Sequence, residues 1–390
     1  MEESELYNIQ TCFNGSRCKL YDLATWKNGA AFKGVKVSPS GKPIIKIAEL
    51  NNGISESTIC TDEQFSEDIL LHKGDLVFAW SGNPETSIDI FRYNLTDGWL
   101  NQHIFKVTVN EKAIDRDFFF YLMKYIKPNF KKIASNKQTT GLGHVTIADL
   151  KAITVTIPNH NLQRHIAEIL KSLDDKIELN NRINHNLEQQ AQALYKSWFV
   201  DFEPFKNGNF IDSELGMIPE GWKTGMLSDL LEVRYGKDHK NLSDGTIPVY
   251  GSGGLMRYAE KALFNNESVL IPRKGTLNNV MYVSKPFWTV DTMFYTVEKA
   301  INSIKYCHQF LLTQDLASMN AGSAVPSMTT EILNNLKLII PSDSVLKDFN
   351  RVVSSLYTNI ECRISETGKL MAYRDSILPK LMSGEELITC

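Results

Sequence analysis

Side chains that can bind a polyanion concentrate in two stretches of the chain that contain no acidic residue. Residues 118–148 carry five lysines without an Asp or Glu, and residues 268–290 carry one arginine and two lysines, again without an acid. Lysine and arginine neutralise phosphates, which supplies much of a protein's affinity for duplex DNA. One such stretch alone is typical of a solvated face. Two, one in each half of the chain, favour polyanion binding.

Two kinds of contact are expected from these side chains, to phosphates and to base edges. The phosphate candidates are Lys127, Lys131, Lys132 and Lys137 in the first half and Lys237, Lys240 and Lys285 in the second. Arginine pairs with guanine, and Asn or Gln with adenine, so base readers should be such side chains on loops. The candidates are Lys46, Asn83, Arg92, Gln102, Asn136 and Gln138, then Tyr250, Ser252, Arg257, Arg273, Lys274, Asn278 and Ser323.

Arg273 is the strongest single candidate. It follows an apolar strand pattern at the place where Ser81 and Gly82 follow a similar pattern in the other half. Each candidate alone could be an ordinary surface or turn residue. As sets on loops in matching positions, they indicate sequence reading.

Catalytic signatures are missing from the sequence. It contains no GxxxxGK[ST] loop for a nucleotide phosphate, no HExxH metal motif and no GxSxG nucleophile motif. Residues 251–254 are rich in glycine, but no helical pattern follows them, so they predict a turn. The side chains indicate recognition, and we expect neither a catalytic residue nor a metal site in this chain.

Bulk composition is that of a globular protein. Hydrophobic residues make up 43% of the 390 residues, and the net charge is −3, so basic character is local. No apolar run approaches the roughly 18 residues of a membrane span, which predicts no membrane contact. Six scattered cysteines without a CxxC pair predict reduced thiols in a cytoplasmic protein.

The elements that must position these side chains occur twice. Residues 20–29 are echoed by residues 227–236 at an offset of 207, and Pro158 by Pro341 at an offset of 183. In the first copy, strands are expected at 43–47, 75–80, 103–109 and 153–157, with one helix over 115–132. The second copy repeats this plan, with a strand at 268–275 and a helix at 304–313.

A long helix with a heptad seam follows each copy. The first seam is Leu173, Ile177, Asn180, Asn184, Leu187, Ala191, Leu194 and Trp198, and adding 183 gives a second from Leu356 to Leu381. Polar residues fall at the same two central positions of both seams. This predicts helices that pack on each other as an antiparallel coiled coil. Each would be about 55–60 Å long at 1.5 Å per residue, enough to place two readers about one turn of DNA apart.

An aromatic cluster ends the first helix. Trp198, Phe199 and Phe202 are too apolar for a solvated helix end. They predict either a binding surface for a partner subunit or a cap on the chain's own core, and the sequence leaves both interpretations open.

Together these segments resemble the specificity subunit of type I restriction–modification enzymes. The resemblance covers nearly the whole chain. It rests on the duplication and on Pro158 with Leu162-Gln163, the run 177–188, the tail 193–204 and the Ile-Pro-Glu-Gly-Trp segment at 218–222. The second helix departs from the pattern: Arg363 and Arg374 occupy its seam, and Pro379 is expected to break its last turn.

The resemblance implies an α+β fold in which two mixed α/β target-recognition domains are separated and followed by long helices, with pseudo-two-fold duplication. The implied boundaries are 1–158 for the first recognition domain, 159–205 for the first helix region, 206–341 for the second domain and 342–390 for the second helix region.

It also implies a function and a set of partners. The chain would read a two-part sequence in double-stranded DNA. Two modification subunits would bind S-adenosylmethionine and methylate adenine, and motor-nuclease subunits would use ATP and Mg²⁺ for cleavage, so that no cofactor binds this chain. Two other classes fit the residues less well: a stand-alone two-headed DNA-binding regulator, and a coiled-coil adaptor without affinity for DNA.

Overall fold

The computed structural model describes residues 6–9, 11–138, 141–320 and 326–385. They form two compact units. The first unit combines residues 1–179 with 366–390, and the second comprises residues 180–365. Each unit therefore holds one mixed α/β globule together with part of both long helices.

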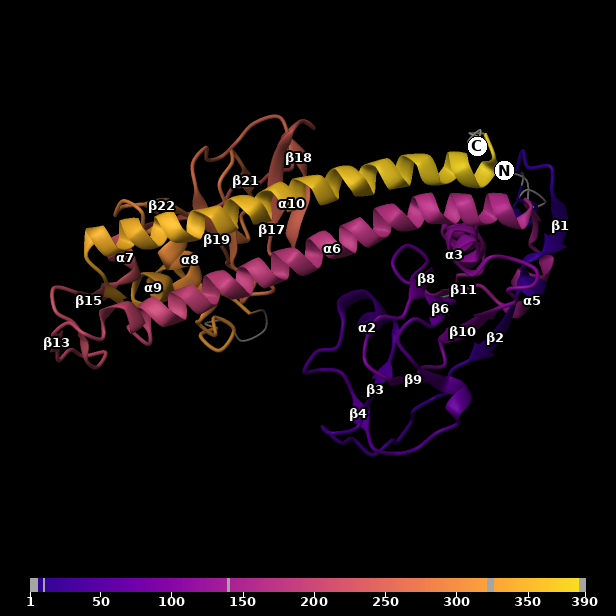
Figure 1. Cartoon of the computed structure of the whole chain (residues 1–390), viewed down its shortest axis with the longest axis horizontal. Helices are drawn as coiled ribbons and strands as arrows, with labels where there is room; N and C mark the ends of the chain where they lie inside the picture. The colour runs from indigo at the N-terminus through magenta and orange to yellow at the C-terminus, as the bar shows by residue number, and fades with distance from the viewer. Residues whose placement is uncertain (1–5, 10, 139–140, 321–325, 386–390) are drawn as a thin grey trace. The chain divides into compact units, whose positions relative to one another are not determined.

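The core of the first globule is an antiparallel four-stranded sheet (Figure 1). Its strand order is β2 (Ala24–Asn28), β10 (Ile104–Val109), β6 (Leu76–Ala79) and β8 (Asp89–Arg92). A smaller sheet has the order β4 (Cys60–Thr61), β3 (Lys42–Ile45), β9 (Gly98–Leu100) and β5 (Leu70–Leu71), and β3 runs parallel to β9. The expected strands are confirmed, because alternating or continuous β-branched runs are reliable strand signals.

Shorter elements complete this globule. They are β1 (Ser16–Lys19) paired with β12 (Thr154–Ile157), β7 (Ser81–Gly82) paired with β11 (Gly143–His144), α2 (Ile47–Asn52), α3 (Arg116–Tyr125), α4 (Lys127–Asn136) and α5 (Ile147–Ala152). The single helix expected over 115–132 is wrong, since α3 and α4 are separate helices that meet at Ile126. Pro128 has no N–H to donate to the carbonyl of Lys124, so a continuous helix is disfavoured there.

The second globule repeats the pairing pattern of the first. Its four-stranded sheet has the order β16 (Leu231–Tyr235), β22 (Met293–Glu298), β19 (Ser268–Pro272) and β20 (Met281–Val283). Strand β17 (Ile247–Gly251) pairs parallel with β21 (Trp288–Thr289) and antiparallel with β18 (Gly254–Ala259). The remaining elements are η3 (Glu203–Phe205), β13 (Phe210–Ile211) paired with β14 (Ile218–Pro219), β15 (Lys223–Met226) paired with β23 (Lys337–Ile340), α7 (Leu227–Leu230), α8 (Ile304–Leu312) and α9 (Thr330–Asn334). The duplication read from the sequence is confirmed for the main four-stranded sheets, whereas, among the described residues, the smaller sheet of the second globule has no strand equivalent to β5.

A glycine at the same position of each repeat explains why the two repeats start alike. A Cβ on Gly29 would lie 2.3 Å from the carbonyl oxygen of Asn101, and a Cβ on Gly236 would lie 2.0 Å from that of Val290. In both halves the backbone of the first sheet strand therefore approaches another strand end too closely for any side chain.

The two long helices are α6 (His160–Phe199) and α10 (Asp343–Ser383). In the first unit, Ile166 and Leu170 of α6 share a core with Ile377 and Leu381 of α10. The start of α6 thus packs on the end of α10, which is an antiparallel arrangement (Figure 1).

In the second unit, the end of α6 packs on the start of α10. The predicted antiparallel coiled coil is therefore confirmed there as well. Tyr195 and Phe199 of α6 share a core with Phe349 and Val353 of α10. The polar seam residue Asn180 is fully buried and Asn184 nearly so. A buried amide in a helical seam fixes the register of the two helices.

The break expected at Pro379 is wrong. Helix α10 continues through Pro379 to Ser383. Ile377, Leu381 and Met382 on either side of the proline are buried in the first unit's core. Their burial outweighs the one backbone hydrogen bond that proline removes.

Candidate nucleic-acid interface

The loop after β19 holds the strongest candidate of the second globule. Backbone hydrogen bonds fix Arg273 on both sides, because its N–H donates to Thr292 O (2.8 Å) and its carbonyl accepts from Met328 N (2.8 Å). Its guanidinium lies 5.3 Å from the centre of the Tyr235 ring, and Nη1 donates to Asp291 O at 3.2 Å. A guanidinium has five N–H donors, so this arrangement orients Arg273 and leaves donors for a ligand.

A hairpin lies against this loop. Strands β17 and β18 are joined by a two-residue turn of Ser252 and Gly253, which confirms the turn predicted there. The side-chain amide of Asn279 donates to Ser252 O at 2.8 Å. Gly275 has a φ of +86°, and a Cβ there would lie 2.8 Å from Ser252 Oγ. Only glycine lets the loop adopt this backbone while touching the hairpin.

Exposed aromatic and apolar side chains lie on this hairpin and on the end of β16. Tyr235, Leu255 and Tyr258 are each 50% exposed, and Met256 is 56% exposed. Such side chains stack on bases or contact the thymine methyl group. The candidates predicted from the sequence did not include them, although the position of Leu255, Met256 and Tyr258 soon after the glycine-rich turn was a usable signal.

Two candidates of the second globule are already bound to their own chain. Arg257 donates through Nη2 to the carbonyls of His239 (3.0 Å) and Leu242 (2.6 Å) and through Nη1 to Asp244. Asn278 uses both ends of its amide, toward Asp315 and Ala317. In this structure the two side chains therefore hold loops in shape, and they would read bases only by giving up some of these bonds.

The other candidates of this globule are distributed around the same loops. Lys274, Lys237, Lys240 and Lys285 are exposed. The backbone of Lys237 is fixed, because its N–H donates to Thr289 O and its carbonyl accepts from Trp288 Nε1, both at 2.9 Å. Tyr250 is partly buried in an apolar cluster, and this burial raises its pKa. Ser323 lies outside the described residues.

In the first globule, the matching loop follows β6, and aromatic side chains pack around it. Trp80 donates from Nε1 to Asn28 Oδ1 at 3.0 Å, and its ring centre lies 6.1 Å from that of His103. His144 Nδ1 and Ser81 Oγ share a hydrogen bond of 2.8 Å. The candidates chosen from the sequence omitted Trp80, Asn28, His103 and His144, because only the fold brings these distant positions together.

The remaining polar candidates of this globule differ in how free they are. Lys46, Asn83, Asn136 and Gln138 are exposed, and Gln102 is partly exposed beside His103. Arg92 forms an ion pair of 2.9 Å with Asp117, and its guanidinium lies 4.1 Å from the Phe120 ring centre. Arg92 thus packs within its own domain and would reach a base only by leaving these contacts.

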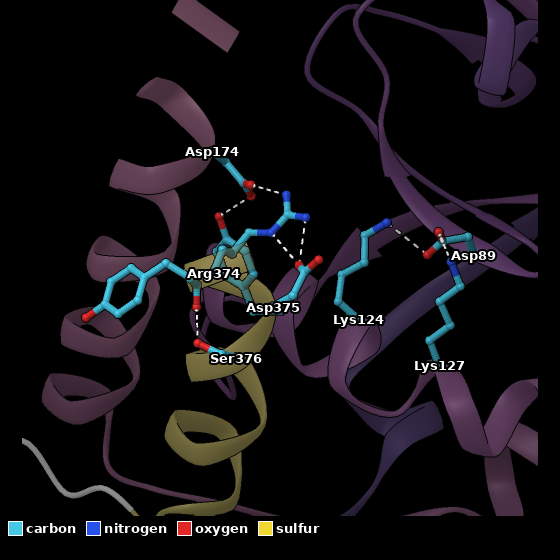
Figure 2. A network of polar contacts seen from close by, with 9 residues as sticks. Asp89, Lys124, Lys127, Asp174, Arg374, Asp375 and Ser376 are labelled. Atoms are coloured by element: carbon cyan, nitrogen blue, oxygen red, sulfur yellow. Dashed lines mark hydrogen bonds and ion pairs between the residues drawn. The ribbon is translucent and has the colours of Figure 1, made fainter. Parts of the chain in front are cut away.

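The acid-free stretch of the first half is not a bare basic patch. Asp89 binds both Lys124 and Lys127 (Figure 2), and Lys131 pairs with Glu85 at 2.7 Å. Lys137 pairs with the buried Asp149. These acids come from other parts of the sequence. Lys127, Lys131 and Lys137 would have to exchange these ion pairs for phosphate contacts, while Lys132 is exposed.

The aromatic cluster at the end of α6 belongs to the chain's own core. Phe199 is 3% exposed, and its ring packs within 5.8 Å of Trp222, Tyr306 and Phe349. Trp198 and Phe202 pack against the same core and are partly exposed. The packing of Phe199 supports the alternative interpretation, in which these aromatic side chains cap the chain's own core.

Within the described part of the chain, no group of three His, Cys, Asp or Glu residues is placed to hold a metal ion. No described helix has the length and apolarity to cross a membrane. The described cysteines Cys12, Cys18, Cys60, Cys307 and Cys362 are free thiols.

Known proteins show the same organisation. The family model for the type I restriction modification DNA specificity domain matches residues 17–189 and 219–363. The MjaIX specificity subunit of Methanocaldococcus jannaschii is 27% identical over 72% of this chain and 71% of its own length. The HindI specificity subunit of Haemophilus influenzae is 24% identical over 81% of this chain and 87% of its own.

A solved structure supports the fold. The S subunit of the type I restriction–modification system from M. genitalium superposes with a TM-score of 0.59 at 16% identity, over 97% of this chain and 98% of its own. Because the family model covers both globules and most of the helix pair, the chain belongs to the family of type I restriction–modification DNA specificity proteins.

Proposed function

We propose that the two globules read the two halves of a split DNA target, and that this chain directs adenine methylation and ATP-dependent cleavage carried out by partner subunits. The observation that carries the proposal is the pairing of a duplicated frame with unlike loops. The same strand order presents Arg273 and Lys274 in one copy and Trp80, Ser81 and Asn83 in the other. Identical loops would read one sequence twice, and unlike loops read two.

In the second globule, the proposed base reader is Arg273, which is held by its backbone and by Asp291. Tyr235 and Tyr258 would contact bases or sugars through their exposed rings. Lys274 and Lys237, with Lys240 and Lys285, would neutralise phosphates.

In the first globule, the proposed readers are Lys46, Asn83, Gln102, Asn136 and Gln138, with Lys132 on a phosphate. Asn and Gln amides suit adenine. The rings of Trp80 and His103 pack together and would hold in shape the loop that follows β6.

The catalytic steps fall to partners in this proposal. Two modification subunits would supply S-adenosylmethionine and the methyl transfer, and motor-nuclease subunits would supply ATP- and Mg²⁺-dependent cleavage, in the cytoplasm where the DNA lies. The relatives named above are each called a specificity subunit of a type I restriction enzyme, which supports a role within a larger assembly.

Co-expression with the genomically neighbouring modification subunit, followed by mapping of methylated adenines across a genome, tests the proposal. The expected result is one two-part motif with a fixed gap. A chain that binds a site tightly alone and yields no methylation with its partner would instead be a stand-alone regulator.

A further inference from the structure

The first globule is attached to the helix pair by a compact ionic cluster. The Tyr121 hydroxyl donates to Asp174 Oδ2 at 2.7 Å, and Arg374 Nη1 donates to Asp174 Oδ1 at 2.7 Å (Figure 2). The guanidinium of Arg92 lies 5.2 Å from the Tyr121 ring centre. Two guanidinium groups thus fill the space between one globule and its helices.

The duplication identifies the same positions in the second unit. The helix offset of 183 relates Asp174 to Tyr357, and Ala191 to Arg374. Antiparallel packing then makes the pair Asp174–Arg374 equivalent to the pair Tyr357–Ala191.

The other two positions follow from local landmarks. The helix caps Asp115 and Ser303 align α3 with α8 at an offset of 188, so that Tyr121 corresponds to Gln309. Arg92 and Tyr282 are the strand partners of Leu76 and Val269, which are equivalent at an offset of 193, so Arg92 corresponds to Tyr282. These four equivalents are the key positions of the second unit.

A cavity occupies this place in the second unit. Its volume is about 570 Å³, and Ala191, Tyr282, Gln309 and Tyr357 all line it. A methyl group and a phenol ring stand where the first unit has two guanidinium groups. The second copy thus has, at the positions that line this cavity, neither of the long cationic side chains of the first.

The polar atoms of the cavity form an acceptor surface. Gln309 is 2% exposed, and its Nε2 donates to the Tyr357 hydroxyl at 2.8 Å. Among the described residues, its buried Oε1 accepts no hydrogen bond. The Tyr357 hydroxyl is also 2.6 Å from His308 Nδ1. A buried acceptor without a donor is costly, so a ligand with N–H donors would satisfy it.

The charges favour a cationic ligand. Glu188 and Glu361 line the cavity. His308 adds no charge at neutral pH, because burial lowers its pKa to about 4. The nearby Lys305 is paired with Glu267 at 2.8 Å and lies over the Tyr282 ring. The cavity is therefore rich in acceptors and carboxylates, and its neighbouring cation is already paired.

We propose that this cavity is the binding site for an arginine side chain of a partner protein, which occupies the place that Arg374 fills in the first unit. Planar N–H donors fit the Gln309 oxygen and the carboxylates, and the tyrosine rings favour a cation. Leu312 and Ile364 at the lining are 38% and 59% exposed. Exposed apolar side chains around an acidic cavity suit a protein surface better than a free small molecule. That the partner is the modification subunit rests on the proposed function.

The first experiment measures a defined probe on the full chain. N-acetyl-arginine N-methylamide should bind saturably in calorimetry, at least ten times more tightly than the lysine analogue. Ala191→Arg should fill the cavity from within and weaken probe binding at least ten-fold. Ala193→Arg is the matched control, because Ala193 is exposed on the same helix, and it should leave probe binding unchanged. Absence of probe binding, or equal binding to Ala191→Arg, overturns the proposal.

The second experiment identifies the occupant. Ala191→Arg should reduce co-purification of the modification subunit, while Ala193→Arg retains it. A thermal melt no lower than that of the original chain shows that Ala191→Arg is folded. Should it melt lower, Glu188→Gln with Glu361→Gln replaces it as the test. If the probe binds but assembly is unaffected by either change, the modification subunit is not the source of the arginine and that part of the proposal is wrong. The mapped methylation motif tests the proposed function separately.

Discussion

Arg273 is the residue at which sequence position and geometry agree most closely. Arg273→Ala should weaken binding of the assembled complex to its target by about 1–3 kcal/mol and relax the preference in one half-site only. The reason is that the backbone bonds of Arg273 and its bond to the Asp291 carbonyl fix the side chain, while other N–H donors of the guanidinium remain for a base. Binding should be measured over a series of half-site variants. An equal loss on every sequence would make Arg273 a phosphate contact instead.

Asp149 binds Lys137, which lies between Asn136 at the end of α4 and Gln138. It is buried and accepts hydrogen bonds from Lys137, Thr146 and Tyr7. Burial opposes its ionisation, but the bonds from Lys137 and Thr146 prevail and lower the pKa of Asp149. Its contribution to stability is therefore full above the unfolded value near pH 4 and is lost as the pH falls through the lower folded value.

Asp149→Asn should therefore lower the free energy of unfolding by about 1–3 kcal/mol at pH 7, because charged hydrogen bonds are lost. Urea unfolding at pH 7 and at pH 3 measures the effect. The difference between variant and original chain should shrink at the lower pH. A difference that stays constant would show that the carboxylate charge is not what stabilises the loop.

The candidate site was only partly predictable at this scale. Exposed residues such as Lys274 and Asn83 follow from turn signals near strand ends. The ion pairs of Arg92 with Asp117 and of Lys127 with Asp89 join residues 25 and 38 positions apart. Only the packing of helices α3 and α4 against strand β8 brings such residues together, so the local sequence could not show that these cations are neutralised.

At the scale of elements, the helix pair depends on the ionic cluster of Figure 2. Arg374→Ala should destabilise the chain by about 1–3 kcal/mol, because it leaves the partly buried Asp174 without its cation. Arg351→Ala is the control on the same helix. Arg351 is 77% exposed and pairs with Asp348 three residues earlier, so its loss should change stability by less than about 0.5 kcal/mol. Thermal unfolding of both variants measures the difference. Equal losses of stability would show that the ionic cluster does not stabilise the helix pair.

The elements themselves were the most predictable part. Heptad spacing gave both long helices because their seams repeat over many turns, and the buried β-branched runs gave the sheet strands. The errors were at prolines, and in opposite directions. Pro128 divides two helices where a single one was expected, and Pro379 lies inside a helix that was expected to break. Whether proline ends a helix depends on what its neighbours bury, which is a tertiary property.

At the scale of the whole molecule, a net charge of −3 and the internal ion pairs limit how many cations meet DNA. Affinity for DNA falls as the salt concentration rises, and each phosphate contact makes the slope of log affinity against log salt concentration steeper by about 0.9. Lys274→Ala should make this slope less steep by about one for the assembled complex. Lys127→Ala should leave it unchanged, because Lys127 is bonded to Asp89. A reduced slope for Lys127→Ala would mean that the ion pair opens on DNA.

The composition of the first unit has a consequence for synthesis. Its core joins Ile9 and Phe13 to Leu381 and Met382, and the N–H of Cys12 donates to the carbonyl of Ser383. The first globule made by the ribosome thus lacks part of its core until residues 377–383 have been synthesised. We expect a nascent chain stalled before residue 366 to be cleaved by protease in its first globule, and the released full chain to resist. The first globule then completes its core only after the second globule has been synthesised.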